Sequence, residues 1–199
     1  FPAEFHAQTA VEAAIILHPH IKDKLDQIKA IEVTTHESAI RIISKVGDLN
    51  NPADRDHCLQ YMIAVGLIYG ELKAEHYEDD FACNSVIDQL REKMVIYEDK
   101  RYSSEYHEAD KRSIANKLQV FFEDGTSTDP VEVEYPIGNK RSREEGIPIL
   151  ENKFKSNLNE IYDSQRSDEI YLKLTDYASL SKMSVPDFQD LLFVKDNSF

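Results

Sequence analysis

The feature that most constrains the fold is the stretch of residues 51–70, which is typical of a helix buried on all sides. Asn51 is a good N-cap, and Pro52 suits the first helical position because an N–H would have no partner there. After the first two turns the only strongly polar residue is Gln60. A helix that is apolar nearly all round has to lie in a core. Its polar start, residues 54–57, must therefore emerge into solvent or into a cleft.

The remaining pattern predicts an α+β fold with an antiparallel sheet, followed by a helical tail. Pro19 is expected to end the first helix, and Asp124-Gly125 to form the turn of a hairpin. The expected strands are residues 30–35, 94–97, 114–122 and 131–135. The expected helices are residues 6–18, 21–28, 37–44, 51–70, 74–80, 84–93, 147–162, 166–178 and 184–192.

Charge and cysteine content exclude several classes of function. The net charge of −14 argues against nucleic acid or an acidic membrane as a partner, because both need a basic face. No apolar run reaches the ~20 residues that span a bilayer. The two cysteines, Cys58 and Cys83, form no CxxC motif and do not suggest a disulfide framework, a zinc site or an iron–sulfur site.

Because Phe1 is not a methionine, we expect the chain to be a fragment of a longer protein.

Arg55 and His57 are the first candidates for a binding site. A helix N-terminus offers free N–H groups and the positive end of the dipole, and an arginine fork suits a carboxylate. These residues therefore predict an anion site at the start of the buried helix. The alternative is that Arg55 pairs with Asp54, Asp56 or another neighbour for purely structural reasons.

A basic loop at residues 138–146 is the second candidate. Lys140, Arg141 and Arg143 cluster there in a chain that is otherwise strongly acidic. The cluster could bind an anion, or it could be a solvated loop balanced by the neighbouring glutamates.

His6 is the third candidate, because it lies beside Glu4 at the entry to a helix. A histidine next to a carboxylate can act as an acid, a base or an anion ligand. The alternative is a capping or buried structural histidine. His36, which precedes Glu37, gives a similar but weaker signal, and no histidines have the spacing of metal ligands.

Four strings together resemble one family, MmgE/PrpD, over roughly residues 1–165. The strings are FPAEFHAQTAVEAA (1–14), LNNPADRDHCLQYM (49–62), IDQLREKM (87–94) and VEVEYPIGNKRSR (131–143). The second string is specific because its uncommon residues occur in a fixed order. The similarity is to the C-terminal region of that family.

The resemblance implies a two-part protein. Residues 1–145 would form a small αβ lid, and residues 146–199 would be a helical segment of a larger, mostly absent helical domain. The active site would lie between the two parts and would use neither a metal nor another cofactor. The partner of this chain would thus be its own N-terminal helical domain, and the full protein would be a homodimer. The protein would lie in the mitochondrial matrix if its source is a eukaryote, or in the cytoplasm if its source is a bacterium. The C-terminal tail favours the eukaryotic source.

The activity implied by the resemblance is removal of water from a small tertiary 2-hydroxy tricarboxylate, by the full-length protein only. The substrate's carboxylates would be held by Arg55, His57, Lys140, Arg141 and Arg143. His6 would belong to the acid–base network, although in decarboxylase relatives a histidine occupies the position of Glu4. The alternatives are a non-catalytic interaction protein on the same fold, or a related aconitate or citrate dehydratase or decarboxylase.

Overall fold

The computed structural model describes residues 1–194 of the 199-residue chain. Its contacts divide the chain into two compact units, unit 1 (residues 1–136) and unit 2 (residues from 137 onward). The sequence placed the boundary after residue 145, and the last five residues of the expected tail, 195–199, lie outside the described residues. The basic loop goes with unit 2, where the carbonyl oxygen of Ile137 lies against Gly146. That these units are a lid and part of a larger helical domain stays a prediction.

Unit 1 combines helices with one sheet, so the predicted α+β class is confirmed. Its strands are β1 (Ile28–Thr35), β2 (Met94–Glu98), β3 (Asn116–Phe122) and β4 (Val131–Val133). Its α-helices are α1 (Gln8–Ile21), α2 (Glu37–Ile43), α3 (Pro52–Arg55), α4 (Leu59–Tyr69), α5 (Asp79–Ala82), α6 (Ser85–Glu92) and α7 (Lys100–His107). Its 3₁₀ turns are η1 (Phe5–Ala7), η2 (Leu25–Gln27) and η3 (Ala74–Tyr77).

The sheet has the strand order β2-β1-β3-β4 and is mixed. β3 is antiparallel to β1 and to β4, but β1 and β2 pair in parallel, with Ile31 opposite Met94. The expectation of a wholly antiparallel sheet is therefore wrong at this edge. The reason is the long connection between the two strands, which carries α2 to α6 and gives the chain the length of a parallel crossover.

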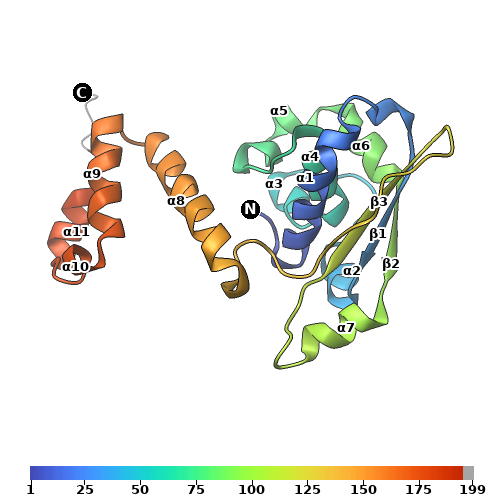
Figure 1. Cartoon of the computed structure of the whole chain (residues 1–199). Coiled ribbons are helices and arrows are strands. Elements are labelled where there is room, and N and C mark those ends of the chain that lie inside the picture. Colours follow the sequence, from blue (N-terminus) through green and yellow to red (C-terminus); the bar gives the residue numbers. More distant parts are fainter. Residues whose placement is uncertain (195–199) are drawn as a thin grey trace. The chain divides into compact units, whose positions relative to one another are not determined.

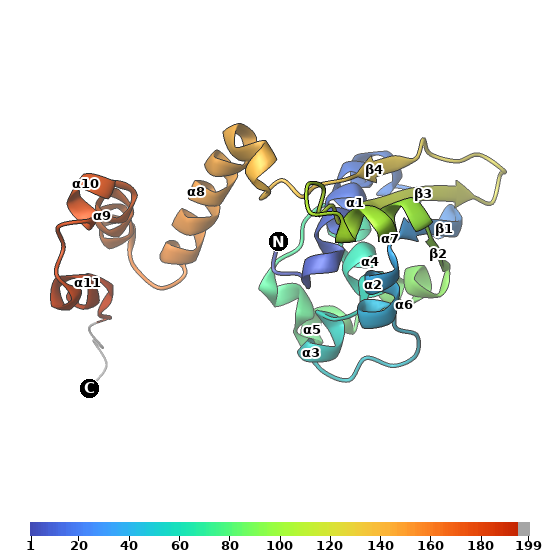
Figure 2. The same cartoon turned by 90° about the horizontal axis from the view of Figure 1, so that it is seen from below.

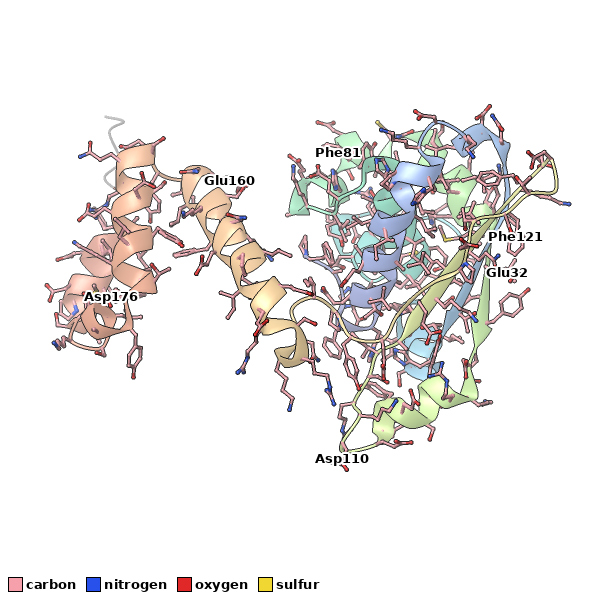
Figure 3. The ribbon with its side chains drawn as sticks, in the orientation of Figure 1. Glu32, Phe81, Asp110, Phe121, Glu160 and Asp176 are labelled. Atoms are coloured by element: carbon pink, nitrogen blue, oxygen red, sulfur yellow. The ribbon has the colours of Figure 1, made fainter. Side chains whose placement is uncertain are left out.

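The helices cover one face of this sheet (Figures 1 and 2). α1 packs on β3 and β4, and α4 packs between α1 and α6. Strand alternation turns Ile31 and Val33 into this core, where both are fully buried. The other face carries Glu32 and Phe121, which point away from the helices in Figure 3. The core of unit 1 is thus one helix-on-sheet interface.

The buried helix predicted at residues 51–70 is present but is divided into α3 and α4. Asn51 caps α3 by accepting a bond from the N–H of Asp54, and Gly70 ends α4 in the left-handed region at φ 68°. Between them the backbone of Cys58 is extended, so the helical hydrogen-bond series stops there and restarts. All residues of α4 up to Leu67 are buried. The prediction of burial is confirmed, and that of one continuous helix is wrong.

Two further expectations about local structure need correction, and one helix was not expected at all. Pro19 lies inside α1 and does not end it, because the single bond it removes falls in the last turn and the N–H of Lys22 still bonds to His18. The helix expected at 21–28 is only the short turn η2. The helix α7 was not expected, although Asp99 caps it by accepting a bond from the N–H of Arg101.

Unit 2 is a small helical unit with its own core. Leu158, Ile170 and Leu191 are its buried apolar residues. Among the described residues its elements are η4 (Lys140–Ser142), α8 (Arg143–Asn159), α9 (Ser164–Thr175), α10 (Tyr177–Leu180) and α11 (Val185–Leu192). Part of the predicted basic loop is therefore helical, because α8 begins at Arg143.

Candidate functional site

Arg55 lies at the end of α3, where its side chain is only 6% exposed. Its Nη1 donates to the carbonyl oxygen of Tyr77 at 2.6 Å, and its Nη2 pairs with a carboxylate oxygen of Asp79 at 2.7 Å. Its Nε has no hydrogen-bond partner among the described residues. Arg55 thus ties α3 to the η3–α5 segment through its two terminal nitrogens, whereas its Nε–H finds no acceptor in the described part of the chain.

Arg55 also lines a pocket of about 610 Å³, a size that suits a small molecule. We call it the arginine pocket. Its wall is formed by residues 45–50 and by Arg55, Tyr61, Asp79, Ala82, Cys83, Asp88, Arg91 and Glu92.

Gln60 explains why the loop at residues 45–50 lies at this pocket. Its side-chain oxygen accepts a bond from the N–H of Lys45 at 3.2 Å, and its side-chain nitrogen donates to the hydroxyl of Ser44 at 3.0 Å. The one strongly polar residue of the buried helix therefore anchors the loop that forms part of the pocket wall.

His57 lies apart from this pocket wall, although it is only two positions from Arg55. Its ring is half exposed, and its Nδ1 lies 2.6 Å from a carboxylate oxygen of Asp56. The N–H of Asp54, in the first turn of α3, is also bonded within the chain, since the side chain of Asn51 accepts from it. The structure therefore separates the two residues that the sequence had joined in one anion site.

The basic cluster lies at the start of unit 2. Lys140 and Arg141 are in η4, and Arg143 opens α8. All three are exposed. Asn139 caps η4 by accepting a bond from the N–H of Arg141 at 3.0 Å. Arg55, His57 and His6 belong to unit 1, so the cluster and these residues lie in different compact units.

His6 lies in a buried aromatic corner that joins η1, the end of β1 and α7. Its ring is 5.0 Å from that of His36 and 5.4 Å from that of Tyr106, both in edge-to-face geometry. His36 and Tyr106 stack, with ring centroids 5.0 Å apart. Glu4 accepts a bond from the N–H of His6 at 2.8 Å and lies 4.0 Å from its ring nitrogen Nε2. The histidine is thus both buried and close to a carboxylate.

Burial sets the protonation of this corner. Desolvation, followed by the nearby His6 and His107, lowers the pKa of His36 to about 4. Desolvation also lowers the pKa of His6, and Glu4 opposes that effect only in part. Both rings are therefore neutral near pH 7, when each has one donor and one acceptor. Among the described residues, Nδ1 of His6 and both ring nitrogens of His36 have no hydrogen-bond partner.

Sequence reasoning missed several of these residues. Arg91 and Lys45 line the arginine pocket, and Tyr106 belongs to the corner of His6. Arg91 lies within the string IDQLREKM, which was noted as a family string but not weighed for charge. No local spacing signals these residues, because the chain brings them in from separate elements.

Within residues 1–194, no three His, Cys, Asp or Glu side chains are grouped so that they could hold a metal ion. None of the described helices combines the length and apolarity that crossing a membrane requires. The expectation of chemistry without metal or cofactor stays a prediction.

Comparison with known proteins gives consistent matches along the chain. The family model of the MmgE/PrpD C-terminal domain matches residues 1–176. The chain is 46% identical over 197 residues to a 2-methylcitrate dehydratase of Escherichia coli (strain K12). That alignment covers 98% of this chain and 41% of the relative. It is 48% identical over 194 residues to a 2-methylcitrate dehydratase of Cupriavidus necator, covering 96% of this chain and 40% of that protein. A relative from Yarrowia lipolytica, named 2-methylcitrate dehydratase, mitochondrial, is 46% identical over 200 residues, or 98% of this chain and 38% of the relative. The chain thus spans about 40% of the length of the curated relatives it matches.

Proposed function

This chain belongs to the MmgE/PrpD family, and from that membership we propose that it is the C-terminal part of a 2-methylcitrate dehydratase. The observation that carries the proposal is identity of 46–48% along nearly the whole chain to enzymes of that name from bacteria and a yeast. The reaction removes water from 2-methylcitrate to give 2-methyl-cis-aconitate, as in the propionate-degrading methylcitrate cycle. Because the relatives are more than twice as long, activity would need the rest of the protein.

The reaction requires three tasks of the protein. A base takes the proton from the carbon next to a carboxylate, an acid protonates the departing hydroxyl as the C–O bond breaks, and cationic groups hold the carboxylates and the charge that develops. Each well-placed charge-assisted bond contributes about 1.5–3 kcal/mol.

We assign the binding of carboxylates to Arg55, which lines the arginine pocket. His57 would contribute at the exposed edge of α3. The basic residues that open unit 2 would bind or steer the trianion in the complete enzyme: Lys140, Arg141 and Arg143.

We assign His6 to the acid–base network. Its ring is neutral near pH 7, since burial lowers its pKa, and a neutral imidazole can accept a proton. Glu4, 4.0 Å from Nε2, would stabilise the imidazolium that results.

The remaining parts of the proposal concern the whole protein. Residues 1–145 would act as the lid and residues 146–199 would complete a larger helical domain. The exposed apolar side chains of unit 2, such as Ile149, Leu150 and Leu172, suit burial against such a domain. The full protein would form a homodimer. The yeast relative's name supports the mitochondrial matrix for a eukaryotic source, and the cytoplasm is the counterpart for a bacterium.

A chimera tests the proposal directly. The matching C-terminal residues of the Escherichia coli relative would be replaced by this chain, and dehydration of 2-methylcitrate followed through the ultraviolet absorbance of the unsaturated product. We expect turnover by the chimera and none by the 199-residue chain alone. Citrate and cis-aconitate serve as competing substrates for the related dehydratase and decarboxylase activities. A folded chimera that turns over none of these, while the parent enzyme is active, would favour a non-catalytic interaction protein.

A further inference from the structure

We propose that Arg91 joins Arg55 in an oxyanion site within the arginine pocket, where Asp79 and Asp88 hold the two guanidinium groups until a polycarboxylate displaces them. The site rests on unit 1 alone. It deepens the proposed function, because it names groups that would hold a substrate's carboxylates. Binding can be measured without turnover, so the two proposals can fail separately.

Arg91 is held in the pocket wall in the same way as Arg55. Its side chain is only 10% exposed. Its Nη2 donates to the carbonyl oxygen of Gly47 at 2.8 Å, and its Nη1 pairs with Asp88 one turn earlier on α6. In each arginine one terminal nitrogen is thus fixed by a backbone carbonyl and the other by an aspartate.

Each arginine also keeps one buried donor. The Nε of Arg55 and the Nε of Arg91 find no hydrogen-bond acceptor within the described part of the chain. An unpaired buried donor on a charged group is costly, and native structures rarely leave one without a reason. Both Nε atoms are buried, so an oxyanion would reach these N–H groups only as it displaces the aspartates, and it would then supply the acceptor that each lacks.

Both arginines act on the same tyrosine. Burial raises the pKa of Tyr61 to about 12, and the charges of Arg55, Asp88 and Arg91 all contribute smaller effects. The phenol itself is occupied, since its hydroxyl donates to the carbonyl oxygen of His76. Tyr61 therefore lines the same pocket wall as both arginines but provides no acceptor for their Nε–H groups among the described residues.

The aspartates are suited to be displaced. The side chain of Asp79 is 82% exposed and that of Asp88 is 60% exposed, although each meets a nearly buried guanidinium. On the aspartate side the exchange costs little, because an exposed carboxylate is well solvated. A nearly buried guanidinium left unpaired would be strongly destabilising, so the incoming oxyanion has to take the place of the aspartate. The backbone carbonyls would keep both guanidinium groups in place during that exchange.

The charges around the pocket define the ligand. Lys45 adds a third positive group, whereas Asp48 and Glu92 oppose any anion. Each guanidinium offers one oxyanion position once its aspartate is displaced. A small ligand with two or more oxyanion groups can therefore engage both arginines, whereas a monoanion engages one and gains less against the same four acidic side chains. Citrate has this chemistry, whereas inorganic phosphate is a single compact oxyanion group and serves as the comparison. The size of the pocket, about 610 Å³, accommodates either.

The test is titration of the ¹⁵N-labelled 199-residue chain at constant ionic strength with citrate, inorganic phosphate and acetate as probes. We expect saturable shifts at residues 45–50 and on α5 and α6 with citrate, weaker ones with phosphate and none with acetate. Arg91→Gln should weaken citrate binding at least about tenfold. Asp88→Asn should tighten it roughly fivefold, because it removes both a competitor and a repulsive charge.

Two further variants keep the test decisive. Arg91→Lys retains the charge but loses the Nε–H, so it should also weaken binding even if Arg91→Gln fails to fold. Arg101→Gln removes an arginine that pairs with Glu105 and Glu132, outside the pocket wall, and should change nothing. Citrate shifts that are absent, or that are the same in Arg91→Lys and Arg101→Gln, would overturn the site. Saturation by phosphate at lower concentration than citrate would identify a phosphate site and overturn the polycarboxylate assignment.

Discussion

The rings of His36 and His6 meet edge to face at a centroid distance of 5.0 Å, and neither of the two ring nitrogens of His36 is bonded within the described residues. The contact joins the end of β1 to η1, across thirty positions of sequence. It makes the protonation of one ring depend on the other, because a charge on either is repelled by a charge on its neighbour.

Acid should destabilise the fold through His36. The pKa of this residue falls from its ordinary 6.5 to about 4 in the folded chain, so between these values the unfolded chain binds a proton that the folded chain does not. The stability that the neutral ring of His36 contributes to the folded chain is fully present above about pH 6.5 and is lost as the pH falls toward 4. We expect His36→Phe to remove on the order of 2 kcal/mol of that pH dependence, measured by urea unfolding from pH 7.5 to 4.5. His57→Gln, which alters a half-exposed ring, is the control and should keep the full dependence.

Loss of His6 should affect turnover more than binding. In the chimera, His6→Gln keeps a polar side chain of similar size but cannot accept a proton at neutral pH. We expect kcat to fall about 10²-fold, with a change in KM of less than about threefold. Steady-state rates against 2-methylcitrate measure both constants. A variant that raises KM and leaves kcat unchanged would place His6 in binding instead.

The side chain of Asn116 links β3 to η1, and replacing its amide with a carboxylate should lower the stability of the fold. Its side-chain nitrogen lies 2.8 Å from the hydroxyl of Thr9 and 3.1 Å from the carbonyl oxygen of His6, and it is fully buried. Asn116→Asp replaces this donor with a carboxylate facing acceptors. We expect a loss of at least about 3 kcal/mol in the free energy of unfolding at pH 7. Gln119→Glu on the same strand should cost under about 1 kcal/mol, because Gln119 lies on the open face. Equal losses in urea unfolding would contradict this assignment.

Gly70 should tolerate no side chain. It has φ 68°, and an added Cβ would lie 2.6 Å from the ring of His18, whose Nδ1 is held by Leu67. Gly70→Ala should therefore destabilise by about 2–4 kcal/mol, from backbone strain and overpacking together. Gly125→Ala is a matched control, since its φ is 84° but its Cβ would meet nothing within 4 Å. Thermal unfolding should show a loss of only about 1–2 kcal/mol there.

The cores of the two units should fail separately. Ile170 is fully buried among Leu158 and Leu191, which belong only to unit 2. Ile170→Ala should cost unit 2 about 2–4 kcal/mol. Hydrogen exchange should then accelerate in α8, α9 and α11 while the strands of unit 1 keep their protection. Equal acceleration in β1 and β3 would show that the two units unfold together.

The sequence by itself determined the parts of this protein that depend on near neighbours. The apolar run of α4, the cap at Asn51 and the glycine that ends the helix follow from local preferences and burial, and they appear in the structure. The alternation of apolar Ile31 and Val33 with more polar neighbours likewise predicts a strand with one buried face. Family strings then indicated the kind of protein, and the chain's membership of the family is established.

Only the tertiary structure decided which distant residues meet. In the folded chain β1 pairs with β2 in parallel. Arg55 bonds to the carbonyl oxygen of Tyr77 and pairs with Asp79, and Arg91 lines the same pocket wall. His57 lies two positions from Arg55, yet it pairs with Asp56 and is not part of that wall. The physical reason is that a local pattern fixes which face of an element is buried, whereas contacts between elements depend on the path of the chain and on packing that no single segment encodes.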